Sequence, residues 1–185
     1  MKKFGVLLLT ILLTPLLAGL YGILHDQLTY TISHEYYTKF KFIQFGLWDR
    51  EGEAIFSNPR LAVAEVGFLA TWWTGIFIGL GHGLTGLIHP DSKTMIKVIS
   101  KATFITLLVA LLTGLFGLAY GKIHLAQKGV NWWLPENLLD KENFISVGSM
   151  HNFSYLGGLL GLILGIIYQI RQKRKTISNT ETLHN

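Results

Sequence analysis

Histidine and acidic side chains gather near one end of each long apolar stretch of this sequence. His25 and Asp26 follow the first apolar run, Glu65 opens the second, His124 follows the third, and His151 opens the fourth. Hydrocarbon disfavours such groups by several kcal/mol, so near a membrane they usually face a cavity, a partner or an ion. In an antiparallel bundle these positions fall in one layer. The pattern therefore indicates a shared polar site.

Imidazole and carboxylate groups are ordinary ligands for zinc, iron, copper and manganese. The sequence predicts a metal site with three histidine ligands and one carboxylate that acts as a ligand or proton acceptor: His25, His124, His151 and Glu65. The simplest alternative is a metal-free polar network, because histidine at a membrane interface commonly binds only water, lipid phosphate or a carbonyl group.

Two further carboxylates are expected to orient the ligands, as carboxylates do around metal-bound histidines: Asp26 and Glu35. The cofactor could be iron, copper or zinc, or haem b. A bis-histidine haem would need His151 to face either His25 or His124 at similar depth. His82, between glycines in the second run, is expected to form a structural hydrogen bond with a neighbouring helix.

Other chemistry is limited by composition. The chain has no cysteine, which rules out disulfides, thiolate nucleophiles, iron–sulfur clusters and thioether-linked haem. No Gly-x-Ser-x-Gly motif, phosphate loop or dinucleotide fingerprint is present. Hydrolase and nucleotide-enzyme functions therefore rank low, and whether the protein is an enzyme stays open.

The elements that would position these residues are membrane helices. The chain has 185 residues, of which 50% are hydrophobic and 15% charged, with a mean hydropathy of +0.39. Four apolar runs are close to the roughly 20 residues that a bilayer requires, at about residues 4–24, 61–88, 102–120 and 145–170. The first is longer than a signal-peptide core of about 7–15 residues and lacks a small-residue cleavage site, so we expect it to remain as an anchor.

The sequence thus predicts an all-α membrane protein, a four-transmembrane-helix bundle over residues 1–172 with a polar cytoplasmic tail at 173–185. Nine lysines and arginines lie at the N-terminus, in the loop after the second run and in the tail, against seven in the two opposite loops. Since basic residues favour the cytoplasmic side, we expect both termini in the cytoplasm of a multi-pass inner-membrane protein. An extracytoplasmic loop of about 36 residues would follow the first span.

Aromatic and basic residues alternate in that loop. The period of two in residues 39–42 indicates a strand, whereas Tyr36, Phe40 and Ile43 fit one face of a helix. Strand and helix therefore both remain possible for this segment. The stretch YTISHEYYTKFKF, residues 30–42, resembles part of an uncharacterised bacterial family of multi-span integral membrane proteins. The likeness covers about residues 21–45 and implies no known activity. That family tends to have proline where His34 stands, which weakens His34 as a ligand.

Glycines recur every four residues in two of the runs, at Gly75, Gly79 and Gly83 and at Gly157, Gly161 and Gly165. This spacing lines small residues along one helix face and allows close backbone contact. The contact could lie within one chain, between copies, or with a larger membrane complex. The basic residues flank apolar runs and so indicate anionic lipid, not nucleic acid, as their partner.

Three functions follow from these observations. The leading hypothesis is a membrane protein whose extracytoplasmic His/carboxylate site binds a metal or haem for redox or metal handling. The second is a small proton-coupled transporter or accessory subunit, with Glu65 and His151 relaying protons. The third is a structural membrane component without catalysis, in which the polar groups only hold the loops together.

Overall fold

A computed structural model describes residues 2–49 and 52–182, with side chains up to residue 175. The fold is all-α, as predicted. In chain order the elements are α1 (Lys3–Ile32), the π-helical turn η1 (Tyr37–Lys41), α2 (Phe42–Gln44), α3 (Pro59–Gly86), α4 (Ser92–Tyr120), the π-helical turn η2 (Gly121–Leu125), α5 (Ala126–Lys128) and α6 (Lys141–Thr182).

Four helices are long and apolar enough to span a membrane: α1, α3, the continuous stretch 92–128 and residues 141–175 of α6. This confirms the four predicted apolar helices. They extend beyond the apolar runs, since α1 continues past residue 24 to Ile32 and α6 begins at Lys141. His25 therefore lies within α1, roughly 10 Å before its end at 1.5 Å per residue. α6 continues into the predicted polar tail as far as Thr182. Residues 183–185 of the tail lie outside the described part.

Local signals explain where two of these helices begin. Pro59 occupies the first turn of α3, where its missing N–H costs nothing, and the Asn58 side chain accepts a hydrogen bond from the backbone of Leu61. Asp91 caps α4 by accepting from the backbone N–H groups of Lys93 and Thr94, at 2.8 and 2.9 Å. A polar residue followed by proline is a common sequence signal for a helix start, and Asn58–Pro59 provides it for α3.

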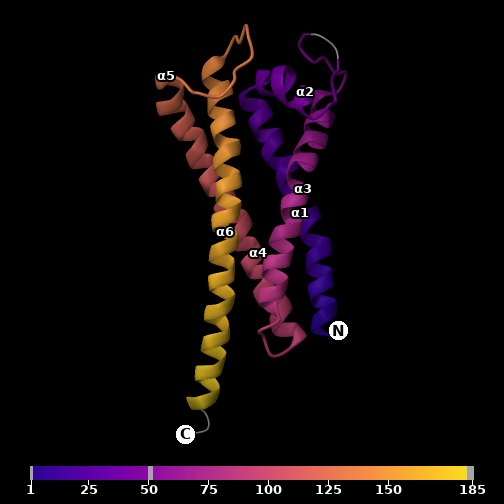
Figure 1. The fold of residues 1–185 in the computed structure, drawn as a ribbon, viewed down its shortest axis with the longest axis vertical. Coiled ribbons are helices and arrows are strands. Elements are labelled where there is room, and N and C mark those ends of the chain that lie inside the picture. Colours follow the sequence, from indigo (N-terminus) through magenta and orange to yellow (C-terminus); the bar gives the residue numbers. More distant parts are fainter. Residues whose placement is uncertain (1, 50–51, 183–185) are drawn as a thin grey trace.

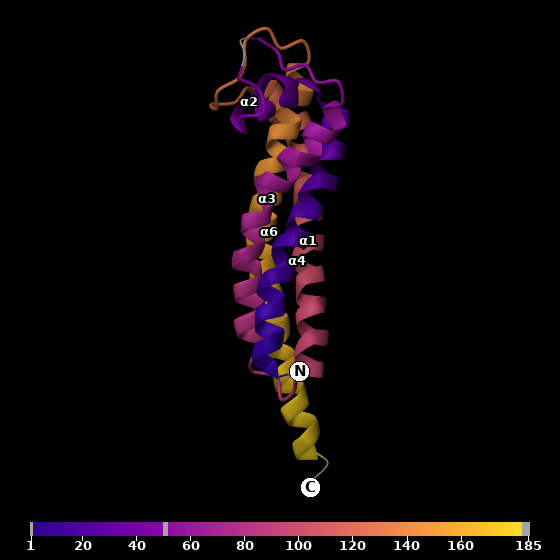
Figure 2. The same ribbon diagram turned by 90° about the vertical axis from the view of Figure 1, so that its right-hand side faces the viewer.

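The helices form an elongated antiparallel bundle. The N-terminus, the short α3–α4 connection and the C-terminal end of α6 lie at one end, and the segments that follow α1 and α5 lie at the other (Figure 1). The view from the side shows α6 extending beyond the other helices at the first of these ends (Figure 2). The candidate site lies near the opposite end, which we call the loop end.

The bundle consists of two tightly packed pairs. α1 packs along α3 and α4 packs along α6, whereas contacts between the two pairs are sparse. Glycine explains the close packing within each pair: Gly75 of α3 lies against the backbone of Pro15, and Gly161 of α6 against the backbone of Thr106. The glycine faces are therefore used inside one chain, the arrangement that their spacing alone had left undecided.

Aromatic residues close the loop end. The segment after α1 is helical, so the choice that periodicity left open is resolved in favour of a helix, through η1 and α2. Its rings pack with the starts of α3 and α6 in one buried cluster, whose core includes Tyr30, Tyr36, Tyr37, Phe42, Val63, Val66, Phe144 and Val147. We call this cluster the aromatic cap.

One glycine contact decides where α1 carries its polar residues. A Cβ on Gly67 of α3 would lie 2.7 Å from the carbonyl carbon of Gly22 and 2.9 Å from the nitrogen of Ile23. Both atoms belong to the backbone of α1 and cannot move aside without moving the helix. Because His25 and Asp26 follow within one turn, this crossing sets their position.

We therefore expect Gly67→Leu to separate α1 from α3 and lower the stability of the detergent-purified protein by about 1–3 kcal/mol, as overpacking does. Thermal unfolding followed by circular dichroism measures this change. The matched control is Gly158→Leu, because a Cβ at Gly158 meets no atom within 4 Å. Equal unfolding temperatures for wild type and Gly67→Leu would show that this contact does not hold the pair together.

Candidate metal centre

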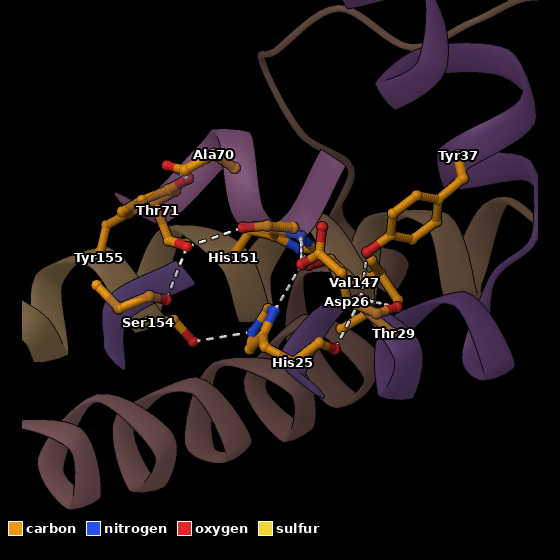
Figure 3. A network of polar contacts seen from close by, with 12 residues as sticks. His25, Asp26, Thr29, Tyr37, Ala70, Thr71, Val147, His151, Ser154 and Tyr155 are labelled. Carbon is orange, nitrogen blue, oxygen red and sulfur yellow. Dashed lines mark hydrogen bonds and ion pairs between the residues drawn. The ribbon is translucent and has the colours of Figure 1, made fainter. Parts of the chain in front are cut away.

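The structure brings His25 and Asp26 of α1 against His151 of α6 (Figure 3). Asp26 Oδ1 lies 3.0 Å from His25 Nδ1 and 3.2 Å from His151 Nε2. One ligand atom from each residue lies within 4.8 Å of the other two. The three side chains are buried, with Asp26 only 2% exposed. Donors about 3 Å apart suit neighbouring ligands on one ion, with bonds of roughly 2.0–2.2 Å.

The hydrogen bonds of His151 determine which of its nitrogens can bind an ion. Its Nδ1 lies 2.9 Å from the carbonyl oxygen of Val147. A carbonyl only accepts, so Nδ1 carries a proton, and Nε2 of the neutral ring is left with a lone pair. That lone pair faces Asp26 Oδ1, which is also an acceptor. Two acceptors at 3.2 Å need a proton or a cation between them.

The contact between His25 and Ser154 of α6 is compatible with either tautomer of the imidazole ring. Its Nε2 lies 3.1 Å from the Ser154 hydroxyl of α6, which can donate or accept. When Nε2 donates to Ser154, the Nδ1 lone pair is directed at the Asp26 carboxylate, beside His151. When Nδ1 carries the proton instead, it donates to Asp26 and Ser154 donates to Nε2. The first state leaves two imidazole lone pairs and a carboxylate converging on one point.

The aromatic cap covers this group on the loop side. The Tyr36 ring lies 4.9 Å from the His151 ring, and the Tyr37 hydroxyl lies 2.6 Å from the hydroxyl of Thr29, one turn beyond Asp26. The cap also holds the ammonium group of Lys41, 5.3 Å from the ring centre of Phe45. Burial lowers the pKa of Lys41, while the nearby Asp26 carboxylate opposes that shift. Water at the loop end is thereby kept from the site.

A cavity of about 340 Å³ lies on the other side of the group, between the two helix pairs. His25, Asp26, His151 and Ser154 line one end of it. At the other end the wall includes Thr106, whose hydroxyl lies 2.9 Å from His82 Nε2. Since Thr106 belongs to α4, His82 has the hydrogen bond to a neighbouring helix that the sequence predicts. The remaining walls are largely apolar.

Two predicted ligands lie elsewhere. Glu65 is exposed on α3, because the helix turns Val63 and Val66 inward and places residue 65 on the outer face. His124 is half-buried in η2, where its ring stacks on Tyr120 at 5.1 Å. Neither joins the His25–Asp26–His151 group. Asp26, predicted to support the ligands, instead lies between them as the third donor.

Glu35, the other predicted supporting carboxylate, ties the two loops together. It accepts hydrogen bonds from the backbone N–H groups of Leu139 and Asp140, at 2.9 and 2.7 Å, and from the Lys39 ammonium group at 2.5 Å. These contacts fix the segment that enters α6 and so support the placement of His151 indirectly. Burial raises the pKa of Glu35, but these three donors outweigh it and hold the pKa below its ordinary value.

Sequence reasoning missed Ser154 and the Tyr21 side chain on the cavity wall. Both signals were present in the spacing: Ser154 follows His151 by three residues, and Tyr21 precedes His25 by four, so each shares a helix face with its histidine. Tyr155, four residues after His151, lines the same cavity.

Comparison with known proteins gives no match among family models, curated proteins or solved structures. The function must therefore be inferred from the geometry of the site.

The Glu35 contacts predict a pH-dependent stability. Glu35→Gln should lower the stability at neutral pH by about 1–3 kcal/mol, because it removes a charged acceptor from three donors. A lowered pKa contributes stability above the ordinary glutamate value of about 4.3, and this is lost as the pH falls through the lower folded value. Thermal unfolding from pH 7 to pH 3 should therefore show the two proteins converging only below about pH 4.3.

Glu136→Gln, an exposed change in the α5–α6 loop that Glu35 contacts, is the matched control and should leave stability unchanged at every pH. A wild-type advantage over Glu35→Gln that persisted unchanged at pH 3 would contradict this account of Glu35.

Proposed function

We propose that the protein spans the inner membrane four times and binds one transition-metal ion through His25, Asp26 and His151, in redox or metal-handling service. The observation that carries the proposal is the fixed tautomer of His151. Its Nδ1–H is bound to Val147, as the second nitrogen of a metal-bound histidine usually is, and in the neutral ring the Nε2 lone pair faces the Asp26 carboxylate. A metal ion between these two acceptors would bind both of them and would also accept the lone pair of His25 Nδ1.

The donor set favours a small ion over haem. Two histidines and one carboxylate are the ligands of many non-haem iron sites, and zinc or copper also accepts them. A bis-histidine haem needs one imidazole on each face of the porphyrin. Here the rings of His25 and His151 meet edge to face at 4.7 Å, and both contact the same carboxylate oxygen. Such a contact leaves no space for a macrocycle between them.

Metal analysis of the detergent-purified protein tests the proposal. We expect close to one iron, copper or zinc ion per chain, and at least a tenfold loss of affinity in His151→Ala and Asp26→Asn, because even changes around such ligands cost about 10–100-fold. Affinity should fall as the pH is lowered, since the imidazoles must be deprotonated to bind.

Glu65→Gln and His124→Ala are the matched controls, because both residues lie outside the group and should leave metal content unchanged. A wild-type protein that stays metal-free after incubation with each ion would refute the proposal, provided that its thermal unfolding shows it folded.

The proposed orientation places both termini in the cytoplasm, supported by the basic residues at the terminal end of the bundle. The natural absence of cysteine provides a clean test. In intact cells a membrane-impermeant maleimide should label Leu139→Cys, a fully exposed position at the loop end, and should label Lys93→Cys only after permeabilisation. The reverse pattern would mean an inverted protein.

A second candidate function rests on a different contact. Ser154 Oγ, His25 Nε2, His25 Nδ1 and Asp26 Oδ1 form a chain with steps of 3.1 and 3.0 Å between residues. This is the connectivity of a nucleophile, its base and the acid that orients the base. Ser154 could attack an ester carbonyl while its proton passes to His25, which would return the proton to the departing alcohol. Such acyl transfer needs no ion, so metal content separates the two candidates.

A further inference from the structure

The cavity beside the site has walls suited to hydrocarbon. It lies where contacts between the α1–α3 and α4–α6 pairs are sparse, and its volume of about 340 Å³ falls within the range of small-molecule sites. Aromatic and aliphatic side chains form most of the wall between the histidine end and Thr106. An apolar cavity of this kind does not hold water well, because water finds too few polar partners there.

Several wall residues also reach the outer surface of the bundle. Phe77 of α3 is 61% exposed and Leu159 of α6 is 57% exposed, although both line the cavity. Trp73 and Tyr155, one turn closer to the loop end, are likewise partly exposed. The cavity therefore meets the apolar outer surface between α3 and α6. In a bilayer that surface is covered by lipid chains.

Entry from the loop end is closed. The aromatic cap lies over His151, and His25, Asp26 and His151 are each at most 7% exposed. A molecule that reaches these side chains without unfolding the cap must come from the side, through the hydrocarbon layer. This condition favours a ligand that already resides in the membrane.

The histidine end of the cavity offers polar atoms that lack partners. Among the described residues, the Tyr21 hydroxyl and Asp26 Oδ2 are buried without a hydrogen bond, and both residues line the cavity. Unpartnered buried groups are costly, so they mark places where a ligand can add hydrogen bonds. A hydroxyl donor beside an ester carbonyl is one such contact. The cavity is thus polar at one end and apolar along its length.

We propose that the cavity binds one acyl chain of an ester-linked membrane lipid, which enters between α3 and α6 and places its ester group beside Tyr21, Ser154 and His151. The lipid would then be the substrate presented to the metal or acyl-transfer chemistry of this site. This inference rests on the proposed function for the reaction, but the binding of the chain can be measured independently of it.

The test uses a phosphatidylcholine with a photoreactive diazirine midway along one acyl chain. Purified full-length protein is reconstituted in vesicles of phosphatidylethanolamine and phosphatidylglycerol that contain this probe, irradiated, and mapped by peptide mass spectrometry. We expect the label to concentrate on cavity residues of α3 and α6. If the label in the wild-type protein were spread evenly over the outer surface of all four helices, this result by itself would overturn the proposal.

A blocking variant strengthens the test. Gly158 lines the cavity and has open space where a Cβ would lie, so Gly158→Phe should fill the cavity without displacing a helix. We expect it to reduce cavity labelling at least fivefold. Leu164→Phe, on the outer face of the same helix and outside the cavity, is the control and should label like wild type. Equal cavity labelling in a folded Gly158→Phe variant would contradict the proposal.

Metal content, read in the same samples, keeps the two hypotheses apart. A metal-free protein whose cavity is labelled would refute the metal proposal and support the lipid site. A metal-loaded protein with dispersed labelling would do the opposite. A co-purified isoprenoid chain that Gly158→Phe excludes, in place of an acyl lipid, would also overturn the assignment of the ligand.

Discussion

The contact between Asp26 and the two histidines is the interaction on which the candidate site depends. A carboxylate that is 2% exposed among apolar helices is costly unless it is paired, and its Oδ1 has both imidazoles within 3.2 Å. Removing both imidazoles would leave the carboxylate as an unpaired buried charge, and breaking a buried ion pair typically costs about 3–5 kcal/mol. The contact also joins α1 to α6, two helices from different pairs that touch little elsewhere. It therefore links the two helix pairs at the level of the candidate site.

The arrangement of the bundle in two pairs explains why a cavity exists beside this group. Glycine lets α1 lie against α3 and α6 against α4, so the close backbone contacts occur within the pairs. Between the pairs the contacts are fewer, and space remains. The aromatic cap then closes the loop end of this space, while the α3–α6 side meets the apolar surface. This packing leaves a buried polar group beside a cavity whose lining reaches the apolar outer surface.

The candidate site was predictable in part. His25, Asp26 and His151 could be named because titratable residues near hydrocarbon usually have a partner and these residues fall in one layer. Glu65 and His124 share that depth but not the direction. A helix advances 100° per residue, so depth in the membrane says nothing about which face a side chain occupies. No sequence motif reveals Ser154, because a motif is contiguous in sequence whereas Ser154 contacts His25 across two helices.

The sequence by itself determined the four apolar helices, the α3 start at Asn58–Pro59 and the level at which the polar residues gather. These properties follow from composition, capping and length, which act locally along the chain. Only the tertiary structure decided that Asp26 lies between two imidazoles, that Val147 fixes the tautomer of His151, and that a cavity adjoins them. Those features depend on how each helix is rotated about its axis and which helix it pairs with. Rotation and pairing are set by contacts such as Gly22 against Gly67, between residues far apart in sequence.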